Sequence, residues 1–146
     1  MAGDPDRTAF LSDGKRTLTT AALTGASTPQ GAAEDFVAAI NGADLEAAAG
    51  CLTREACLIT PDSTAVSGRA EICGVLAQMI AQSVGIAVSA SSTIAAGEVA
   101  HLKQRWRIQV GTDSGRPYTR EVDPLFVVRR VEARWKLAIV APWGLR

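Results

Sequence analysis

Residues 101–110 read HLKQRWRIQV, and apolar and polar side chains alternate along most of this stretch. Alternation of this kind is typical of a β-strand with one face on a core. One face carries Leu102, Gln104, Trp106 and Ile108, whereas the opposite face is mainly basic. The first face therefore predicts the inner side of a sheet, where the amide of Gln104 must find a hydrogen-bond partner in the protein, water or a ligand.

Further strands are predicted on both sides of this stretch. Before it, side chains alternate from Ile86 to Ile94, and Ala96-Gly97 turns the chain. After it, the turn-forming string GTDSGRP leads to strands over 118–131 and 135–141, joined by a tight connection. Together these segments predict a long antiparallel meander.

The apolar period changes to that of a helix nearer the N-terminus. A stripe that begins after Pro29 predicts one helix over 29–41, and Asp44 can cap a second helix over 45–52. A small hairpin is predicted over 56–66, and Ser67-Gly68 opens a third helix. Three helices followed by a meander predict an α+β domain, with the helices gathered on one face of a curved antiparallel sheet.

The composition predicts a single soluble domain. The chain has 146 residues, of which 47% are apolar and 21% are charged, and no apolar run approaches the roughly 20 residues of a membrane span. A formal net charge of zero argues against nucleic-acid binding. Residues 1–28 hold few large apolar side chains, so we expect a flexible or partner-held arm before a domain over 29–146.

Charge is distributed unevenly between the two parts of the sequence. Residues 99–146 contain 10 basic and 4 acidic side chains, whereas acidic residues dominate residues 1–98. One interpretation is that the two parts are different faces of one domain. An anionic ligand near the basic part is the alternative interpretation.

Cysteine and histidine content argues against a metal site. Cys51, Cys57 and Cys73 form an odd set without a CxxC pair, which fits small buried thiols in a reducing cytoplasm. His101 is the sole histidine, and the sequence has neither a glycine-rich phosphate loop nor a GxSxG turn. The first ten residues lack the basic start and apolar core of a signal peptide. We therefore expect a cytoplasmic protein with no metal and no cofactor.

Four strings taken together resemble the nuclear transport factor 2-like superfamily: AAEDFVAAINGADLEAAAGCL, PDSTAVSGRAEI, LKQRWRIQVGTDSGRP and RWKLAIVAPWG. Within it the likeness is to SnoaL-like and ketosteroid-isomerase-like proteins, including small members of bacterial polyketide and enediyne biosynthesis. It covers about residues 29–144. The resemblance implies a cone-shaped, cystatin-like fold in which a bent sheet wraps the first helix and leaves an apolar pocket. It also implies a homodimer that pairs through the outer sheet face.

The catalytic groups of the ketosteroid isomerases are absent from the matching positions. The resemblance places the tyrosine donor at Phe36, the aspartate base at Thr60 and a second acid near Leu125. Phenylalanine has no proton to donate, and a threonine hydroxyl is too weak a base to remove a proton from carbon. Steroid isomerisation is therefore excluded.

We expect a ligand pocket between the first helix and the sheet, lined by Phe36, Thr60, Gln104 and Trp106. Trp106 and Trp143 each offer an indole N–H to a flat unsaturated ligand, and Tyr118 offers a phenolic hydroxyl. Core packing is the alternative interpretation for each tryptophan. For Gln104 the alternative is an amide satisfied by its protein neighbours.

Asp123 is the candidate catalytic acid. It stands among apolar residues in the string REVDPLFVV, and Pro124 after it indicates a bulge or a sheet edge. Burial would raise the pKa of its carboxyl towards that of a useful base. A salt bridge to Arg105, Arg107 or Arg120 is the competing interpretation.

These features favour a small-molecule-binding protein of bacterial secondary metabolism. Its ligand would be a hydrophobic unsaturated intermediate of polyketide or enediyne type, and the protein could assist a cyclisation or another acid–base step. An enzyme of this kind would be a cofactor-independent cyclase, isomerase or hydrolase. A non-catalytic dimeric interaction module is the first alternative, and an epoxide-opening hydrolase is a weaker one. We expect a homodimer, with no nucleic acid or membrane among its partners.

Overall fold

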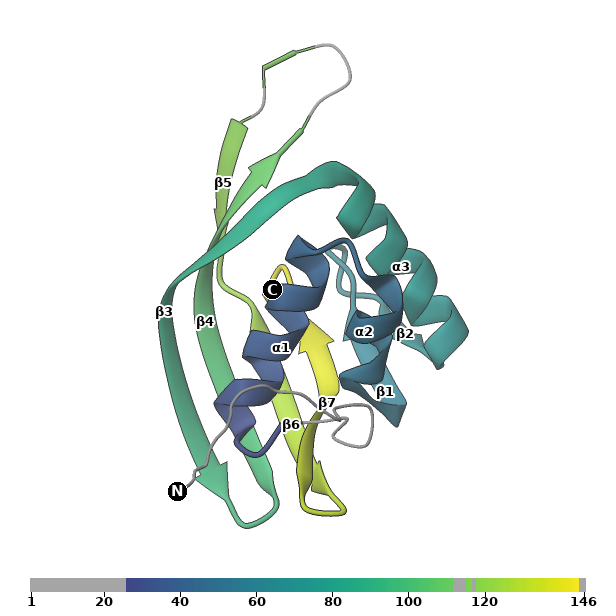
Figure 1. Cartoon of the computed structure of the whole chain (residues 1–146), viewed down its shortest axis with the longest axis vertical. Helices are drawn as coiled ribbons and strands as arrows, with labels where there is room; N and C mark the ends of the chain where they lie inside the picture. The colour runs from purple at the N-terminus through teal and green to yellow at the C-terminus, as the bar shows by residue number, and fades with distance from the viewer. Residues whose placement is uncertain (1–25, 112–114, 117, 145–146) are drawn as a thin grey trace, which may run out of the picture.

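Three helices lie against one side of a single curved sheet, which wraps around the first of them (Figure 1). The computed structural model describes residues 26–111, 115, 116 and 118–144. The predicted α+β class is confirmed. Most of the expected N-terminal arm lies outside the described residues. Among the described residues before α1, Ala26 pairs with Trp135 through backbone hydrogen bonds of 2.8 and 3.3 Å.

Local capping signals place the helix starts where the sequence predicted them. Helix α1 spans Pro29–Asn41, and the Thr28 hydroxyl accepts a hydrogen bond from the Gly31 N–H at 3.0 Å. Helix α2 spans Leu45–Gly50, and Asp44 caps it by accepting from the Ala47 N–H. These side chains satisfy N–H groups that have no partner inside the helix. Helix α3 spans Arg69–Gln82 and packs through Ile72, Leu76 and Met79.

Among the described residues, seven strands form the sheet in the order β2-β1-β7-β6-β4-β3, and β5 pairs with β4 beside this path. Their bounds are β1 Leu52–Ile59, β2 Ala65–Ser67, β3 Ser83–Ala96, β4 Val99–Val110, β5 Tyr118–Val122, β6 Leu125–Val131 and β7 Arg134–Ala141. The pairs that β3, β4, β5, β6 and β7 form with one another are antiparallel, as the predicted meander requires.

The sheet is mixed, which corrects the expectation of a wholly antiparallel one. Strand β1 pairs with β2 in a local hairpin, but its other edge pairs in parallel with β7, near the C-terminus. Alternation of side chains defines which face of a strand is buried and gives no information about its direction relative to a distant strand. The β1–β7 pairing therefore could not be predicted from the sequence pattern.

The segment predicted as one strand over 118–131 is two strands separated at Asp123-Pro124. Strand β6 pairs with the first half of β4, and β5 pairs with the second half. Pro124 has no N–H to continue a ladder, but its carbonyl accepts a hydrogen bond of 3.1 Å from the Gln104 N–H. The β4 edge thus passes from one partner to the other at Gln104.

Aromatic rings fill the space between α1 and the sheet. Phe36 of α1 meets Phe126 of β6 edge-on at a centroid distance of 6.1 Å, and Trp106 of β4 lies 5.8 Å from Phe126. All three side chains are fully buried. Rings in this arrangement gain stability beyond their apolar burial.

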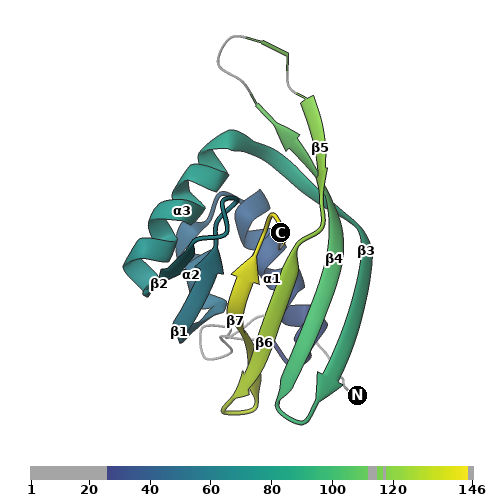
Figure 2. The same ribbon diagram turned by 180° about the vertical axis from the view of Figure 1, so that it is seen from behind.

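Seen from behind, the sheet presents its outer face with the helices on the far side (Figure 2). In the described part of the chain, no helix is long and apolar enough to cross a membrane.

Candidate functional site

Gln104 and Trp106 satisfy each other inside the core. The Trp106 indole N–H donates to Gln104 Oε1 at 2.8 Å, and Gln104 Nε2 donates to the Ser91 hydroxyl at 3.3 Å. Both side chains are buried, and Trp106 packs against Phe126. The polar groups that we expected to face a ligand are therefore bonded within the protein. This agrees with the alternative interpretations, core packing for Trp106 and an amide satisfied by its protein neighbours for Gln104.

Thr60 lies in the turn between β1 and β2. Its hydroxyl oxygen accepts a hydrogen bond from the Thr64 N–H at 3.1 Å. It also donates to the carboxylate of Asp62, and this hydrogen bond lowers the pKa of that carboxyl. Thr60 thus closes a hairpin turn by bonds within the turn itself.

Asp123 lies on the outer face of the sheet, which contradicts the burial that we expected. Its carboxylate accepts from Arg105 Nε at 2.9 Å, and the side chain is 62% exposed. The neighbours Val122 and Pro124 are buried, so alternation along the chain turns Asp123 outward. The competing interpretation, a salt bridge to an arginine of the adjoining strand, is confirmed.

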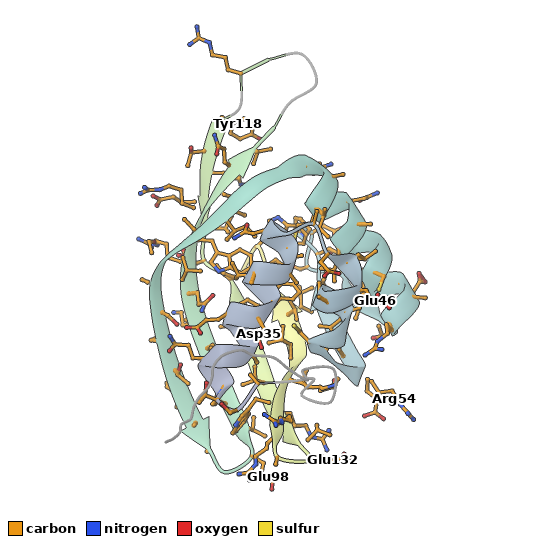
Figure 3. The ribbon with its side chains drawn as sticks, viewed as in Figure 1. Asp35, Glu46, Arg54, Glu98, Tyr118 and Glu132 are labelled. Carbon is orange, nitrogen blue, oxygen red and sulfur yellow. The ribbon has the colours of Figure 1, made fainter. Side chains whose placement is uncertain are left out.

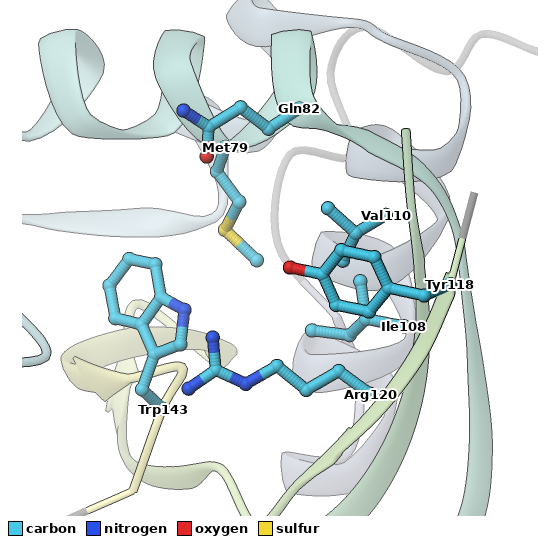
Figure 4. Close-up of a pocket in the computed structure, with 7 residues that line it drawn as sticks. All are labelled: Met79, Gln82, Ile108, Val110, Tyr118, Arg120 and Trp143. Atoms are coloured by element: carbon cyan, nitrogen blue, oxygen red, sulfur yellow. The ribbon is translucent and has the colours of Figure 1, made fainter. Parts of the chain in front are cut away.

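Two predicted ligand contacts, Tyr118 and Trp143, do come together at one pocket (Figure 4). The pocket lies at the end of the sheet opposite the turns of Glu98 and Glu132, as the position of Tyr118 in Figure 3 shows. Its volume is about 100 Å³. The described lining residues are Met79, Gln82, Ile108, Val110, Tyr118, Arg120 and Trp143. We call this cavity the β5 pocket.

The register of β4 and β5 brings two walls of the β5 pocket together. Ile108 lies opposite Arg120, and Val110 lies opposite Tyr118, so the four side chains share one face of the ribbon. The buried Val122 lies on the same face, two residues after Arg120. The last turn of α3 supplies Met79 and Gln82, and the Gly111 N–H fixes that turn to the end of β4 by donating to the Gln82 carbonyl at 3.0 Å.

The turn after β7 carries Trp143 and depends on Gly144. The Gly144 N–H donates to the Ala141 carbonyl at 2.9 Å. Gly144 has a φ of +80°, and a Cβ at this position would lie 2.7 Å from the carbonyl oxygen of Asp123. Only glycine allows both this backbone conformation and this approach without strain. The glycine thus holds the turn, with its tryptophan, against the kink between β5 and β6.

Hydrogen-bond donors converge in the β5 pocket. Figure 4 shows the Tyr118 hydroxyl and the Arg120 guanidinium directed into the same space, with the indole of Trp143 beside the guanidinium. The described lining residues include neither aspartate nor glutamate. Sequence reasoning treated Arg120 only as a salt-bridge partner. Counting in steps of two from the apolar Val122 would have placed both Arg120 and Tyr118 on the inner face.

Helices enclosed by a bent sheet, with a pocket at one end, are the fold that the resemblance to nuclear transport factor 2-like proteins implied. The chain belongs to the SnoaL-like domain family, whose family model matches residues 33–136. A search of curated proteins finds no significant match. Membership of this family is consistent with binding of a small molecule or with catalysis that needs no cofactor.

Solved structures show the same fold at low sequence identity. A ketosteroid isomerase-like protein from Erwinia carotovora atroseptica superposes with a TM-score of 0.69 at 19% identity, covering 77% of this chain and 90% of the other. A candidate aromatic ring hydroxylase from Novosphingobium aromaticivorans gives 0.68 at 19% identity, covering 77% and 82%. A candidate dehydratase of the NTF2-like family from Streptomyces avermitilis gives 0.66 at 20% identity, covering 77% and 89%.

Proposed function

We propose that the protein binds a hydrophobic, unsaturated small molecule in the β5 pocket, and that this ligand is of the polyketide or enediyne type found in bacterial secondary metabolism. The supporting observation is the convergence of Tyr118 and Trp143 with apolar side chains of α3 and β4 around one cavity. Apolar walls with a few converging polar groups are the usual composition of a small-molecule site. Two aromatic side chains add flat surfaces that suit conjugated ligands.

The size of the β5 pocket limits how much of the ligand it encloses. An apolar cavity of about 150 Å³ holds a benzene molecule, and the β5 pocket measures about 100 Å³. Tyr118 is 51% exposed, so the pocket opens to solvent on that side. Only part of a ring or one end of a polyene would therefore enter, and the remainder of the molecule would extend through the opening.

Any catalytic contribution of the β5 pocket would come from its hydrogen-bond donors. Tyr118, Arg120 and Trp143 could stabilise negative charge that develops on a carbonyl oxygen during a cyclisation. Proton abstraction would need a base, and the described lining residues supply no carboxylate and no histidine. For the same reason the epoxide-opening alternative, which needs converging carboxylates, has no support from this lining. Binding is thus the primary function that we propose.

Titration with trans-cinnamamide, a small planar and uncharged probe, tests the proposal. Binding would shift the indole N–H resonance of Trp143 in a two-dimensional NMR spectrum, and Trp143→Ala would weaken affinity at least tenfold. Ile94→Ala is the matched control, because Ile94 is 72% exposed on β3 and does not line the β5 pocket. Binding that leaves the Trp143 resonance unmoved and survives Trp143→Ala would place the ligand elsewhere and refute the proposal.

A dimeric interaction module is a second candidate, favoured by the outer face of the sheet. Val99 and Ile139 are exposed there, beside the basic side chains of β4. The close packing of Phe36, Trp106 and Phe126 occupies space that we expected to hold ligand, which also favours this alternative. We propose that two copies of the chain associate through this face, and the association is compatible with a ligand in the β5 pocket.

A further inference from the structure

We propose that the ligand of the β5 pocket carries an ionised carboxylate, and that Arg120 binds this group. The inference rests on the proposed binding function and adds a chemical class to it. It starts from three arginines at neighbouring positions of β4 and β5, which differ in the partners of their side chains.

Two of these arginines are paired on the outer face of the sheet. Arg105 binds Asp123 at 2.9 Å, and Arg107 binds Glu121 at 3.2 Å. These two pairs use Glu121 of β5 and Asp123, which directly follows β5, on the face that points away from the helices. Arg120 directly precedes Glu121 in sequence, so it points to the opposite, inner face and lines the β5 pocket.

Arg120 has no carboxylate partner in the part of the chain that the structure describes. Its guanidinium lies beside the Trp143 indole and shares a cavity with Met79, Ile108 and Val110. The Arg120 side chain is exposed at the opening of the pocket, and none of the described lining residues brings a negative charge to it. An anion that enters the pocket would meet this charge with a charge-assisted hydrogen bond. The environment of Arg120 therefore favours an anionic ligand.

The neighbouring polar groups also favour two acceptor oxygens on the ligand. Tyr118 offers a hydroxyl proton, Trp143 offers an indole N–H, and Arg120 offers the planar fork that matches a carboxylate. Hydrogen bonds to a charged acceptor are about twice as strong as those between neutral groups. The same side chains would bind a neutral carbonyl, but without the charge contribution of the guanidinium.

The end of α3 sets the orientation of the ligand. Met79 and Gln82 come from the last turn of this helix, where the helix dipole places partial negative charge. Figure 4 shows Gln82 across the cavity from the Arg120 guanidinium. The carboxylate would therefore lie at the Arg120 and Trp143 side, and the apolar part of the ligand would contact Met79 and Ile108.

A comparison of trans-cinnamate with trans-cinnamamide tests the inference, because the two probes have nearly the same shape and differ in charge. We expect cinnamate to bind the wild-type chain about 10- to 100-fold more tightly, as measured by calorimetry or NMR titration at neutral pH. Arg120→Gln would reduce this preference to about threefold or less. Added salt would also reduce it, because mobile ions screen a charge pair that is open to solvent.

Arg129→Gln provides the matched control, since Arg129 is an exposed arginine of β6 opposite Val99, at the far end of β4 from Val110. This variant has the same change in net charge and should keep the full preference for cinnamate. Circular dichroism would verify that both variants are folded.

The possible results separate the inference from the proposed function. Equal affinity for the two probes, with no effect of Arg120→Gln, would overturn the carboxylate and leave a pocket for uncharged ligands. An equal loss of preference in both arginine variants would also overturn the inference, since net charge and not Arg120 would then be responsible. Failure of both probes to bind at millimolar concentration would refute the proposed function together with the inference.

Discussion

Gln104 contributes to the core by accepting the hydrogen bond of a buried indole. Gln104→Leu introduces an apolar side chain that can still fill part of the space, but it leaves the Trp106 N–H without its acceptor. We expect the free energy of unfolding to fall by about 1–3 kcal/mol, the cost of an unsatisfied buried donor. Urea denaturation monitored by circular dichroism measures this change.

The double variant Gln104→Leu/Trp106→Phe supplies the control. Phenylalanine has no N–H, so the second substitution removes the unsatisfied donor while it adds the loss of ring volume. The two losses should therefore sum to more than the loss of the double variant. Strict additivity would show that this hydrogen bond does not contribute to stability.

Asp123 should have little influence on either stability or binding. Its ion pair with Arg105 is exposed, and exposed pairs contribute little because water and salt screen them. We expect Asp123→Asn to keep the denaturation midpoint and the affinity for trans-cinnamamide unchanged within error. A large loss of turnover in this variant, once a substrate is known, would restore the catalytic role that the sequence suggested.

Cys51 should react more slowly than the other thiols. Burial raises the pKa of the Cys51 thiol from 9.0 to about 11, the charge of Asp35 adds to this effect, and Lys136 opposes it. Because the thiolate is the nucleophile, alkylation by iodoacetamide at pH 8 should modify Cys57 and Cys73 before Cys51. Peptide mapping by mass spectrometry measures the order, and equal rates for all three would contradict it.

The same thiol makes stability depend on alkaline pH. Below pH 9 it is protonated in both the folded and the unfolded chain, whereas between about 9 and 11 only the unfolded chain ionises. The free energy of unfolding should therefore decrease as the pH rises through this interval. The decrease should be shallower in Cys51→Ala.

At the scale of elements, the turn after β7 is held by a single glycine. In Gly144→Ala the new Cβ would meet the Asp123 carbonyl oxygen at 2.7 Å, in a backbone conformation that costs a non-glycine residue about 1–2 kcal/mol. We expect a loss of stability of at least this size and a weaker affinity for trans-cinnamamide, because the turn that carries Trp143 must move. Thermal denaturation and probe titration measure the two effects.

Gly74→Ala is the contrasting substitution. Gly74 lies inside α3, and a Cβ there would meet no atom within 4 Å. Alanine should stabilise this helix by about 0.5–1 kcal/mol. If both glycine variants changed stability equally, the close approach at Gly144 would not matter.

Local signals predicted the helices well, and non-local pairing limited the rest. Thr28 and Asp44 act through bonds to residues three positions away, so their caps can be read from the sequence. The inner face of β4 was also predictable, because alternation is local. The parallel β1–β7 pairing joins distant segments, and the packing of Phe36 against Phe126 depends on how the sheet bends. For this reason the sequence predicted a cavity at a place where Phe36 and Trp106 pack with Phe126. It also predicted Tyr118 and Trp143 as ligand contacts without the Arg120 that lines the same pocket.

At the scale of the whole molecule, we predict a homodimer that forms through the outer sheet face. Sedimentation velocity at micromolar concentration should give a dimer, and Ile139→Arg should shift it to a monomer. Ala77→Arg is the control, because Ala77 is exposed on α3, on the opposite side of the sheet. The basic side chains of β4 should make the association depend on salt. A wild-type monomer at these concentrations would contradict the prediction.

Strand β5 has a consequence for how this protein could change in evolution. Among the described residues it pairs with β4 alone, and Tyr118 and Arg120 are exposed, whereas the rings that fill the core come from α1, β4 and β6. Substitutions at 118 and 120 would therefore alter the ligand without the stability loss that core substitutions bring. New specificities could arise by a few mutations in this one strand while the scaffold remains intact.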